Sequence, residues 1–325
     1  MRKFIAASLS ALLLASTTAS AQRVISMATL APQGTTWMRV FDAANRDLRR
    51  RSNGQLSMRW YAGGVQGDEA EVVRKIRTGR LDGAAITAVG LSHIYRPILA
   101  FMVPGIFPNP GGLVRARDTL RADIEHGFEA AGFSLMGFGG SGATRMFSRR
   151  LIRTPADLRA AHPWQWREDI ILPAMFAEVG VTGVTLQVPE VLSAIQTNRV
   201  DTVTCTALQG VALQWTTQMQ YMSERASGAS LGAMVISRSV IQSLPADQQQ
   251  LLREITTQYD TLLARNVARD DDAAAATLQQ RGLQVVTLTD AERAQWNQVF
   301  TRTRTRLAGA IADAAWMSRV EAAGR

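Results

Sequence analysis

The chain has 325 residues, with 36 lysines and arginines against 27 aspartates and glutamates, which gives a formal net charge of +9. The cationic side chains are scattered among acidic ones. A nucleic-acid-binding protein would gather them in a stripe or tail with interleaved aromatic residues, so this class is disfavoured. The only cysteine, Cys205, excludes an intramolecular disulfide, and a chain of this length can instead be stabilised by its hydrophobic core.

The first residues have the organisation of a secretory signal peptide. Arg2 and Lys3 precede an apolar run over residues 4–15, and Ala19 and Ala21 form an A-x-A cleavage site. The apolar run is too short to span a bilayer, which needs about 20 residues. We therefore expect residues 1–21 to be removed and the mature protein to be periplasmic, without membrane insertion. Loss of Arg2 and Lys3 lowers the net charge from +9 to +7.

Beyond the signal peptide, strand-like apolar runs alternate with segments of helical spacing. Such alternation predicts parallel sheets flanked by helices. The predicted strands cover residues 24–29, 56–60, 84–87, 133–138, 163–166, 182–186, 202–205 and 231–236. The predicted helices cover residues 37–48, 68–76 with a capping box of Asp68 and Glu71, 113–131, 171–179 and 188–197, with a capped turn at 154–157.

A long helix is predicted from Pro245 to about Gln280. Proline suits the first helical position, Asp247 lies in the first turn, and apolar residues recur on one face. At about 1.5 Å per residue this helix would be about 50 Å long. Because one small lobe cannot cover that length, we expect the helix to brace two lobes. A last helix is predicted to begin at the capping box of Thr289 and Glu292.

The sequence contains no convincing catalytic, cofactor or metal motif. Residues 137–142 match G-x-G-x-x-G, but residues 143–148 are predicted to be extended, so no helix dipole would face a pyrophosphate. His93, His126 and His162 are far apart and lack the spacing of metal ligands. We therefore expect a binding protein that is not an enzyme and that has no cofactor or metal.

Five motifs fall in order along residues 24–286. They are YAGGVQGD at 61–68, GRLD at 79–82, PADL at 155–158, EVLSAIQTNRVD at 190–201, and Leu244, Pro245 and Gln248 at the start of the long helix. With these motifs the chain resembles the solute-binding proteins of tripartite ATP-independent periplasmic (TRAP) transporters.

The resemblance implies a two-lobed α/β periplasmic binding protein with crossing hinge segments, whose lobes close on a ligand. It further implies a small organic acid as ligand and the integral membrane subunits of a TRAP transporter as partners. We expect lobe I to comprise residues 22–144 plus about 228–268, and lobe II residues 145–227 plus about 269–325. A sensory or hydrophobic-ligand carrier receptor and a periplasmic enzyme on the same fold are the alternatives.

Relatives in this family typically hold a carboxylate with an arginine in the strand after the P-A-D-L turn, because a guanidinium meets both oxygens at once. Trp164 stands at that place here. Either Arg167 does this work, or Arg145 holds the acid group alone, or the ligand is mostly apolar. We favour a mixed site. Trp164 and Trp166 share one face of their strand and Gln165 takes the other, so an aromatic wall would suit a bulky or ring-containing acid. Whether that face lines the cleft or the core is left open.

Further candidate ligand-binding residues follow predicted strands or lie in loops, where α/β clefts hold their ligands. They are Thr29, Trp37, Thr87 and Tyr95 near the N-terminus, Cys205 at a position that is commonly polar in the relatives, and Gln214 and Trp215 at the start of a return segment.

Overall fold

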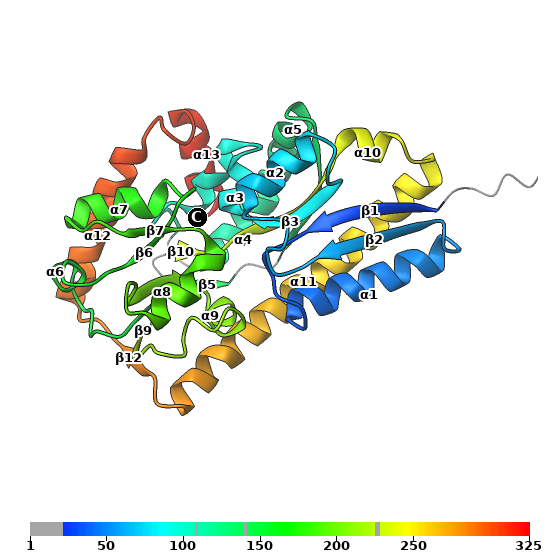
Figure 1. The fold of residues 1–325 in the computed structure, drawn as a ribbon. Coiled ribbons are helices and arrows are strands. Elements are labelled where there is room, and N and C mark those ends of the chain that lie inside the picture. The colour runs from blue at the N-terminus through cyan, green and yellow to red at the C-terminus, as the bar shows by residue number, and fades with distance from the viewer. Residues whose placement is uncertain (1–21, 108–109, 140–141, 225–227) are drawn as a thin grey trace, which may run out of the picture.

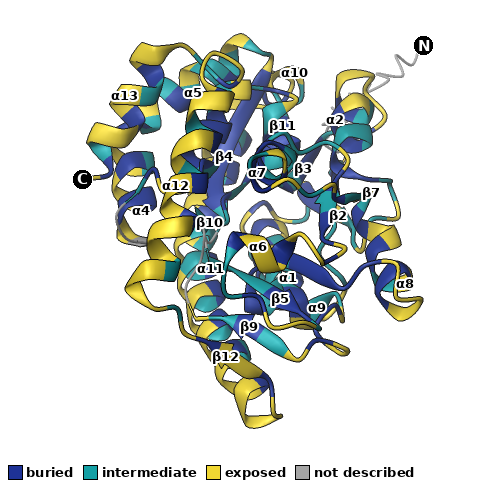
Figure 2. Cartoon of the chain, turned by 90° about the vertical axis from the view of Figure 1, so that its left-hand side faces the viewer, coloured by how far each residue is buried: buried dark blue, intermediate teal, exposed yellow. Residues whose placement is uncertain are grey.

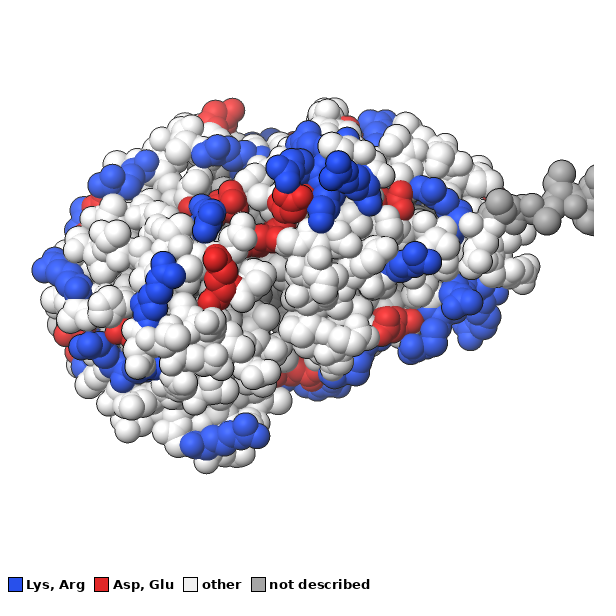
Figure 3. All heavy atoms as spheres, viewed as in Figure 1, with Lys and Arg blue, Asp and Glu red and all other residues white. Residues whose placement is uncertain are grey.

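The computed structural model describes residues 22–107, 110–139, 142–224 and 228–325. The predicted signal peptide, residues 1–21, and positions 140–141 of the glycine-rich segment lie outside them. The described chain forms two α/β lobes, and a long helix runs beneath both of them (Figure 1). Lys and Arg side chains are interspersed with Asp and Glu over the face shown in Figure 3. Within the described ranges no helix is both long enough and apolar enough to cross a bilayer.

Lobe I is built on a five-stranded sheet in the order β2-β1-β3-β11-β4. Strand β1 is parallel to β2 and β3, whereas β11 is antiparallel to β3 and β4. The central strands are buried between helices, whose outer faces are exposed (Figure 2). The strands are β1 (Arg23–Ala28), β2 (Leu56–Tyr61), β3 (Gly83–Thr87), β4 (Phe133–Gly139) and β11 (Gly232–Ser237). The helices are α1 (Thr36–Arg51), α2 (Glu69–Arg77), α3 (Ala88–Ser92), η1 (Arg96–Met102), α4 (Pro110–Thr119), α5 (Arg121–Ala130) and α10 (Arg238–Gln242).

Lobe II contains a second sheet in which β5 is antiparallel to β8, β9 and β10, and β9 is parallel to β12. Its strands are β5 (Ala143–Ser148), β8 (Thr202–Cys205), β9 (Tyr221–Ser223), β10 (Gly228–Ala229) and β12 (Gln284–Val286). Strands β6 (Trp164–Trp166) and β7 (Val184–Leu186) form a small parallel sheet beside it. The helices are α6 (Pro155–Leu158), α7 (Ile171–Val179), η2 (Val188–Glu190), α8 (Val191–Gln196), α9 (Ala207–Ala212) and α12 (Asp290–Leu307).

Helix α11 (Ala246–Gln280) braces both lobes, as the sequence predicts. Its 35 residues span about 50 Å at about 1.5 Å per residue. Leu252 and Ile255 lie in the core of lobe I, and Ala275 and Leu278 lie in the core of lobe II. The helix therefore belongs to both hydrophobic cores.

The last helix, α13 (Ala314–Ala323), differs from the expected assignment of residues 269–325 to lobe II. It packs against α4 and η1 of lobe I. Trp316 and Val320 are buried in the lobe I core, and Trp316 Nε1 donates to the Pro97 carbonyl at 3.0 Å. The chain thus returns to lobe I after α12.

Other local predictions also need correction. The sheets are mixed rather than parallel, because β11 returns antiparallel between β3 and β4. The helix predicted over residues 113–131 is divided at Leu120 into α4 and α5. Asp68 caps α2 through the Glu69 amide alone and forms no capping box with Glu71.

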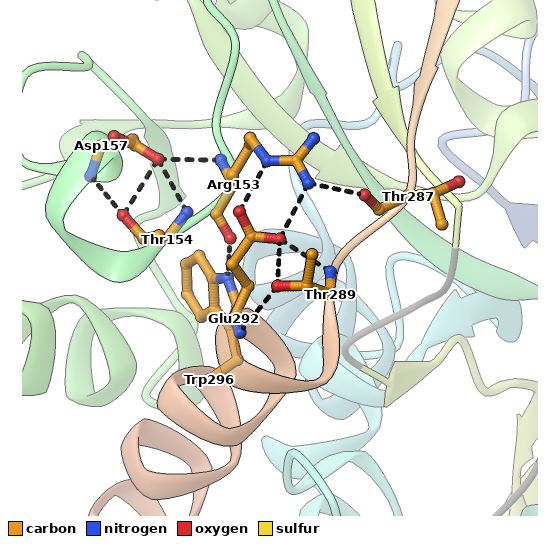
Figure 4. A network of polar contacts seen from close by, with 7 residues as sticks. All are labelled: Arg153, Thr154, Asp157, Thr287, Thr289, Glu292 and Trp296. Carbon is orange, nitrogen blue, oxygen red and sulfur yellow. Dashed lines mark hydrogen bonds and ion pairs between the residues drawn. The ribbon is translucent and has the colours of Figure 1, made fainter.

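The predicted capped turn at 154–157, which is a capping box in the structure, and the predicted capping box of Thr289 and Glu292 are both confirmed and are joined by an ion pair (Figure 4). Arg153, just before the Thr154 cap of α6, donates from Nε and Nη2 to the Glu292 carboxylate at 2.6 and 2.9 Å. Glu292 also accepts from the Thr289 amide at 2.7 Å, and Trp296 Nε1 donates to the Arg153 carbonyl at 2.9 Å. These contacts fix the start of α12 to the strand-to-α6 connection.

Candidate ligand-binding cleft

Two adjacent cavities lie where the lobes meet. The first has a volume of about 150 Å³ and the second about 140 Å³. Both are lined by Thr87 at the end of β3, by Trp166 of β6 and by Gln209 of α9, and also by Ser230 and Leu231 before β11. We call the side chains of Thr87, Gln209 and Ser230 the polar rim, because they stand where the two cavities adjoin.

The first cavity opens at the carboxyl ends of two parallel strands. Thr29 follows β1, Thr87 ends β3, and Trp37 lies in the first turn of α1. Lobe II contributes Trp166 and Thr206 to the opposite side. Of the residues predicted from the sequence, Thr29, Trp37 and Thr87 are thus brought together at this cavity.

The second cavity is bounded by an indole wall, formed by Trp164, Trp166 and Trp215. The rings of Trp164 and Trp166 lie 6.1 Å apart between centroids, and Trp215 meets Trp164 edge-on at 4.9 Å. Trp164 Nε1 donates to the Leu186 carbonyl at 3.2 Å. Cys205 also lines this cavity, and burial raises the pKa of its thiol. Trp164, Cys205 and Trp215 are therefore placed together at the cleft.

The face that Trp164 and Trp166 share belongs to the core of lobe II and also lines the cleft. The two side chains are 4% and 8% exposed and belong to the core of lobe II, yet both line the second cavity. Gln165 points to the other face and donates to Thr185 Oγ1 at 2.7 Å. The two alternatives that the sequence leaves open are thus not exclusive.

Neither candidate arginine is among the residues that line the cavities. Arg145 Nη1 donates to the carbonyl oxygens of Ser223, at 3.3 Å, and Glu224. Arg167 is exposed and lies 3.8 Å from Glu190. The guanidinium of Arg145 is therefore bonded to backbone carbonyls, and that of Arg167 is paired with a surface carboxylate.

Gln214 and Tyr95 also lie away from the cavities. Gln214 is exposed and takes a left-handed conformation, with φ of 61°, where the chain leaves α9. Tyr95 packs in lobe I against Phe128 and Trp316, with ring centroids 5.6 and 6.4 Å away. Neither residue is therefore among those that line the cleft.

The described lining contains carboxyl groups but no lysine or arginine. Glu69 and Asp260 line the first cavity, and Asp169 lines the second. Burial raises the pKa of Asp260 to about 6, against the opposing positive charges of Arg117 and Arg121. Burial likewise raises the pKa of Asp169, which accepts from the backbone amides at the start of α7. None of these three carboxyl groups is predicted from the sequence.

Glu69 is held in place by donors from the neighbouring strand and helix. Its carboxylate accepts from Thr87 N at 2.9 Å, Thr87 Oγ1 at 2.7 Å and Gly90 N at 2.9 Å. Burial raises its pKa to about 7, and the three hydrogen bonds oppose a larger rise. Glu69 therefore positions Thr87 at the polar rim and titrates near neutral pH.

Gln209 was also missed, because the short helix α9 was not predicted. Its signal was present as a capping box, since Thr206 Oγ1 accepts from Gln209 N and Gln209 Oε1 accepts from Thr206 N, both at 3.1 Å. Among the described residues, no group of three or more His, Cys, Asp or Glu side chains is arranged to hold a metal ion.

One carboxylate joins the lobes beside the cleft. Asp68, 2% exposed at the start of α2 in lobe I, accepts through Oδ2 from Trp166 Nε1 at 2.8 Å and from Val188 N at 3.2 Å, both in lobe II. Its other oxygen accepts from Glu69 N at 2.8 Å. We call this contact, which joins the two lobes, the Asp68 bridge.

Known structures share this architecture. A TRAP periplasmic solute-binding protein from Shewanella oneidensis with bound succinate is 17% identical, with a TM-score of 0.86 over 94% of this chain and 100% of that chain. An extracytoplasmic solute receptor from Bordetella pertussis that binds pyroglutamic acid is 15% identical, with a TM-score of 0.85 over 93% of this chain and 99% of that chain. These likenesses confirm the two-lobed fold.

Sequence comparison gives the family. A solute-binding protein of Albidiferax ferrireducens is 22% identical over 129 residues, which are 39% of this chain and only 38% of that curated relative. Residues 27–308 match the bacterial extracellular solute-binding proteins of family 7, DctP, a family of receptors rather than enzymes. Because that match covers most of the sequence, this chain belongs to the DctP family of bacterial extracellular solute-binding proteins.

Proposed function

We propose that this protein is a periplasmic receptor that closes on a small organic acid with substantial apolar surface and delivers it to the membrane subunits of a TRAP-type secondary transporter. The observation that carries the proposal is the pair of largely apolar cavities between the lobes, joined at the polar rim. Family membership supports solute binding. Succinate, pyroglutamic acid and orotic acid, bound by proteins of similar structure, are all small organic acids.

The composition of the lining favours a ligand with one acid group. The described lining residues offer neutral donors, such as the Ser230 hydroxyl and the Gln209 amide, but no guanidinium or ammonium group. The Glu69 and Asp169 carboxylates would repel a second negative charge. The apolar part of the ligand would lie on the indole wall, because mainly apolar sites orient their ligands with few polar groups.

The proposed location and lobe boundaries rest on separate observations. The predicted signal peptide with cleavage after Ala21 supports export, in keeping with a family of extracellular proteins. The core clusters support lobe I as residues 22–144 plus about 228–268, joined by about 308–325, and lobe II as residues 145–227 plus about 269–307.

The test combines a search for the ligand with one substitution. Native mass spectrometry of freshly purified protein is expected to show a bound organic acid, and titration calorimetry then gives its affinity. Trp164→Ala is expected to weaken binding about tenfold to hundredfold, since a large buried apolar contact is lost. Trp296→Ala, which removes a buried indole that is not among the lining residues of either cavity, is the matched control. Unchanged affinity in Trp164→Ala would remove the indole wall from the site.

The apolar lining also fits a hydrophobic-ligand carrier that never docks on a transporter. The two functions differ in what the loaded receptor does next. Ligand-loaded protein added to vesicles that contain TRAP membrane subunits drives uptake only if it is a transport receptor. Binding without uptake would favour the carrier.

A further inference from the structure

The apolar layer beneath α1 and α11 is divided into two clusters. One contains Leu48 and Leu252, and the other contains Phe41 and Leu263. Trp60, Met234 and Tyr259 contact both clusters but are only half-buried, although they lie between the sheet and its covering helices. Protein interiors are normally close-packed, so this division marks a space inside lobe I.

That space is the inner part of the first cavity, which we call the inner chamber. It is lined by Ala44 of α1, Met58 and Trp60 of β2, Met136 of β4, Met234 of β11 and Tyr259 of α11. Ala44 is 2% exposed, and Met58 and Met136 are 4% exposed, so the chamber lies deep below the surface. It belongs to the same cavity as Thr87 and Gln209 and is therefore reached from the polar rim.

We propose that the inner chamber is a second apolar subsite, which takes an aromatic ring of the ligand while the acid group stays at the polar rim. This inference rests on the proposed function and makes the ligand an aryl-substituted monocarboxylic acid. Its support is the size, shape and chemistry of the lining, together with the access from the rim.

The size of the space suits one ring. An apolar cavity of roughly 150 Å³ can remain dry and bind a benzene-sized guest. The first cavity, of which the inner chamber is the inner part, has about this volume in all, so a ring in the chamber would also take up space toward the polar rim. A guest would restore contacts that the lining atoms lack in an empty space. An anionic group is disfavoured there. The chamber residues carry no charge, and Asp260 of α11, which also lines the cavity, would repel an anion.

The shape and chemistry of the walls favour an aromatic guest over a flexible chain. Trp60 is stacked on Phe41, with ring centroids 4.3 Å apart and planes 9° from parallel, and this pair forms a flat side. Met58, Met136 and Met234 lie on three strands of the same sheet. Thioethers adapt their shape to a guest and make favourable contacts with aromatic rings.

The first experiment uses 3-phenylpropionate as the probe and propionate as its counterpart without a ring. Titration calorimetry is expected to show binding of 3-phenylpropionate at least about tenfold tighter than that of propionate. Ala44→Leu fills the chamber and should weaken 3-phenylpropionate about tenfold or more. Ala43→Leu is the matched control, because this neighbour on α1 does not line the cavity. Equal affinity in Ala44→Leu and Ala43→Leu would overturn the proposal.

Benzene tests the chamber without an acid group. It is expected to raise the Tm of the wild type and of Ala43→Leu, and to shift methionine methyl resonances in the wild type. If Ala44→Leu does not fold, the wild-type spectra provide the test. Methionine resonances that benzene leaves unshifted would overturn the proposal that the inner chamber binds a ring. A benzene response in a protein that binds no organic acid supports the chamber and contradicts the proposed function. Binding of an organic acid without any benzene response supports the proposed function and contradicts the chamber.

Discussion

Glu69 and Asp260 give the cleft a charge that changes near neutral pH. Burial raises their pKa values to about 7 and about 6, and both groups line the first cavity without a lysine or arginine among the described lining residues. Above these pKa values the cavity carries negative charge, which opposes an organic anion. Below them the carboxyls are protonated and this repulsion is removed.

Affinity for an organic anion is therefore expected to rise as pH falls from 8 to 6. An affinity higher by about threefold to tenfold corresponds to a change of less than one unit in the pKa of each carboxyl group when the anion binds. Calorimetry with 3-phenylpropionate at both pH values measures it, since the ligand itself stays ionised there. Asp260→Asn should lose part of the gain, and Asp272→Asn, an exposed position on the same helix, should keep it. A pH-independent affinity in the wild type would contradict this assignment.

Residue-level prediction succeeded where a local pattern decides the outcome. The alternation of Trp164, Gln165 and Trp166 is confirmed, because strand geometry alone sets which side chains share a face. Arg145 shows the limit of such patterns. Its position in β5 is extended, as predicted, but the pairing of β5 with β9 brings carbonyl oxygens to its guanidinium group. That pairing joins residues far apart in sequence.

At the scale of elements, the Arg153–Glu292 pair fixes α12 and carries a pH dependence. The guanidinium of Arg153 and the donors from Thr289 lower the pKa of Glu292 to about 2, below its ordinary value of 4.5. A lowered folded-state pKa contributes stability that is present above the unfolded-state pKa and is lost as pH falls toward the folded value. The contribution should therefore fade between about pH 5 and pH 2.

Glu292→Gln is expected to lower the Tm at pH 7, because Arg153 loses its charged partner. The difference from the wild type should shrink as the pH is lowered toward 3. Thermal unfolding followed by circular dichroism at several pH values measures both effects. Asp290→Asn, on the same first turn of α12 but fully exposed, is the control and should change little. An equal Tm loss at pH 7 and pH 3 would show that the pair is not the cause.

Elements with local signals were predicted well, and elements that depend on distant contacts were not. Helix α7 and the capped starts of α6 and α12 follow from residues within each segment. The antiparallel direction of β11 and the return of α13 to lobe I are decided by partners elsewhere in the chain. Neither can be derived from the periodicity of its own segment.

For the whole molecule, the Asp68 bridge is expected to favour the closed arrangement. Asp68→Ala leaves Trp166 Nε1 and Val188 N without their acceptor, and hydrogen bonds to a charged group contribute about 1.5–3 kcal/mol. The open population should grow, and the apparent affinity should fall about tenfold or more because fewer molecules are competent to bind.

Small-angle scattering with saturating ligand measures the change in lobe arrangement, and calorimetry measures the affinity. Glu71→Ala is the matched control, since Glu71 lies on the same helix and forms an ion pair with Arg74 at the surface. The Asp68→Ala protein should have a larger radius of gyration than this control. Identical scattering and affinity in the two variants would exclude the bridge as a determinant of closure.

The return of α13 to lobe I sets the order in which the protein can be assembled. Trp316 and Val320 complete a core whose first strand begins at Arg23, so lobe I lacks part of its interior until nearly the whole chain has been synthesised. Contacts between such distant residues slow folding, because a long loop must close before they form. Lobe I of a nascent chain is therefore expected to stay incomplete until α13 has been synthesised.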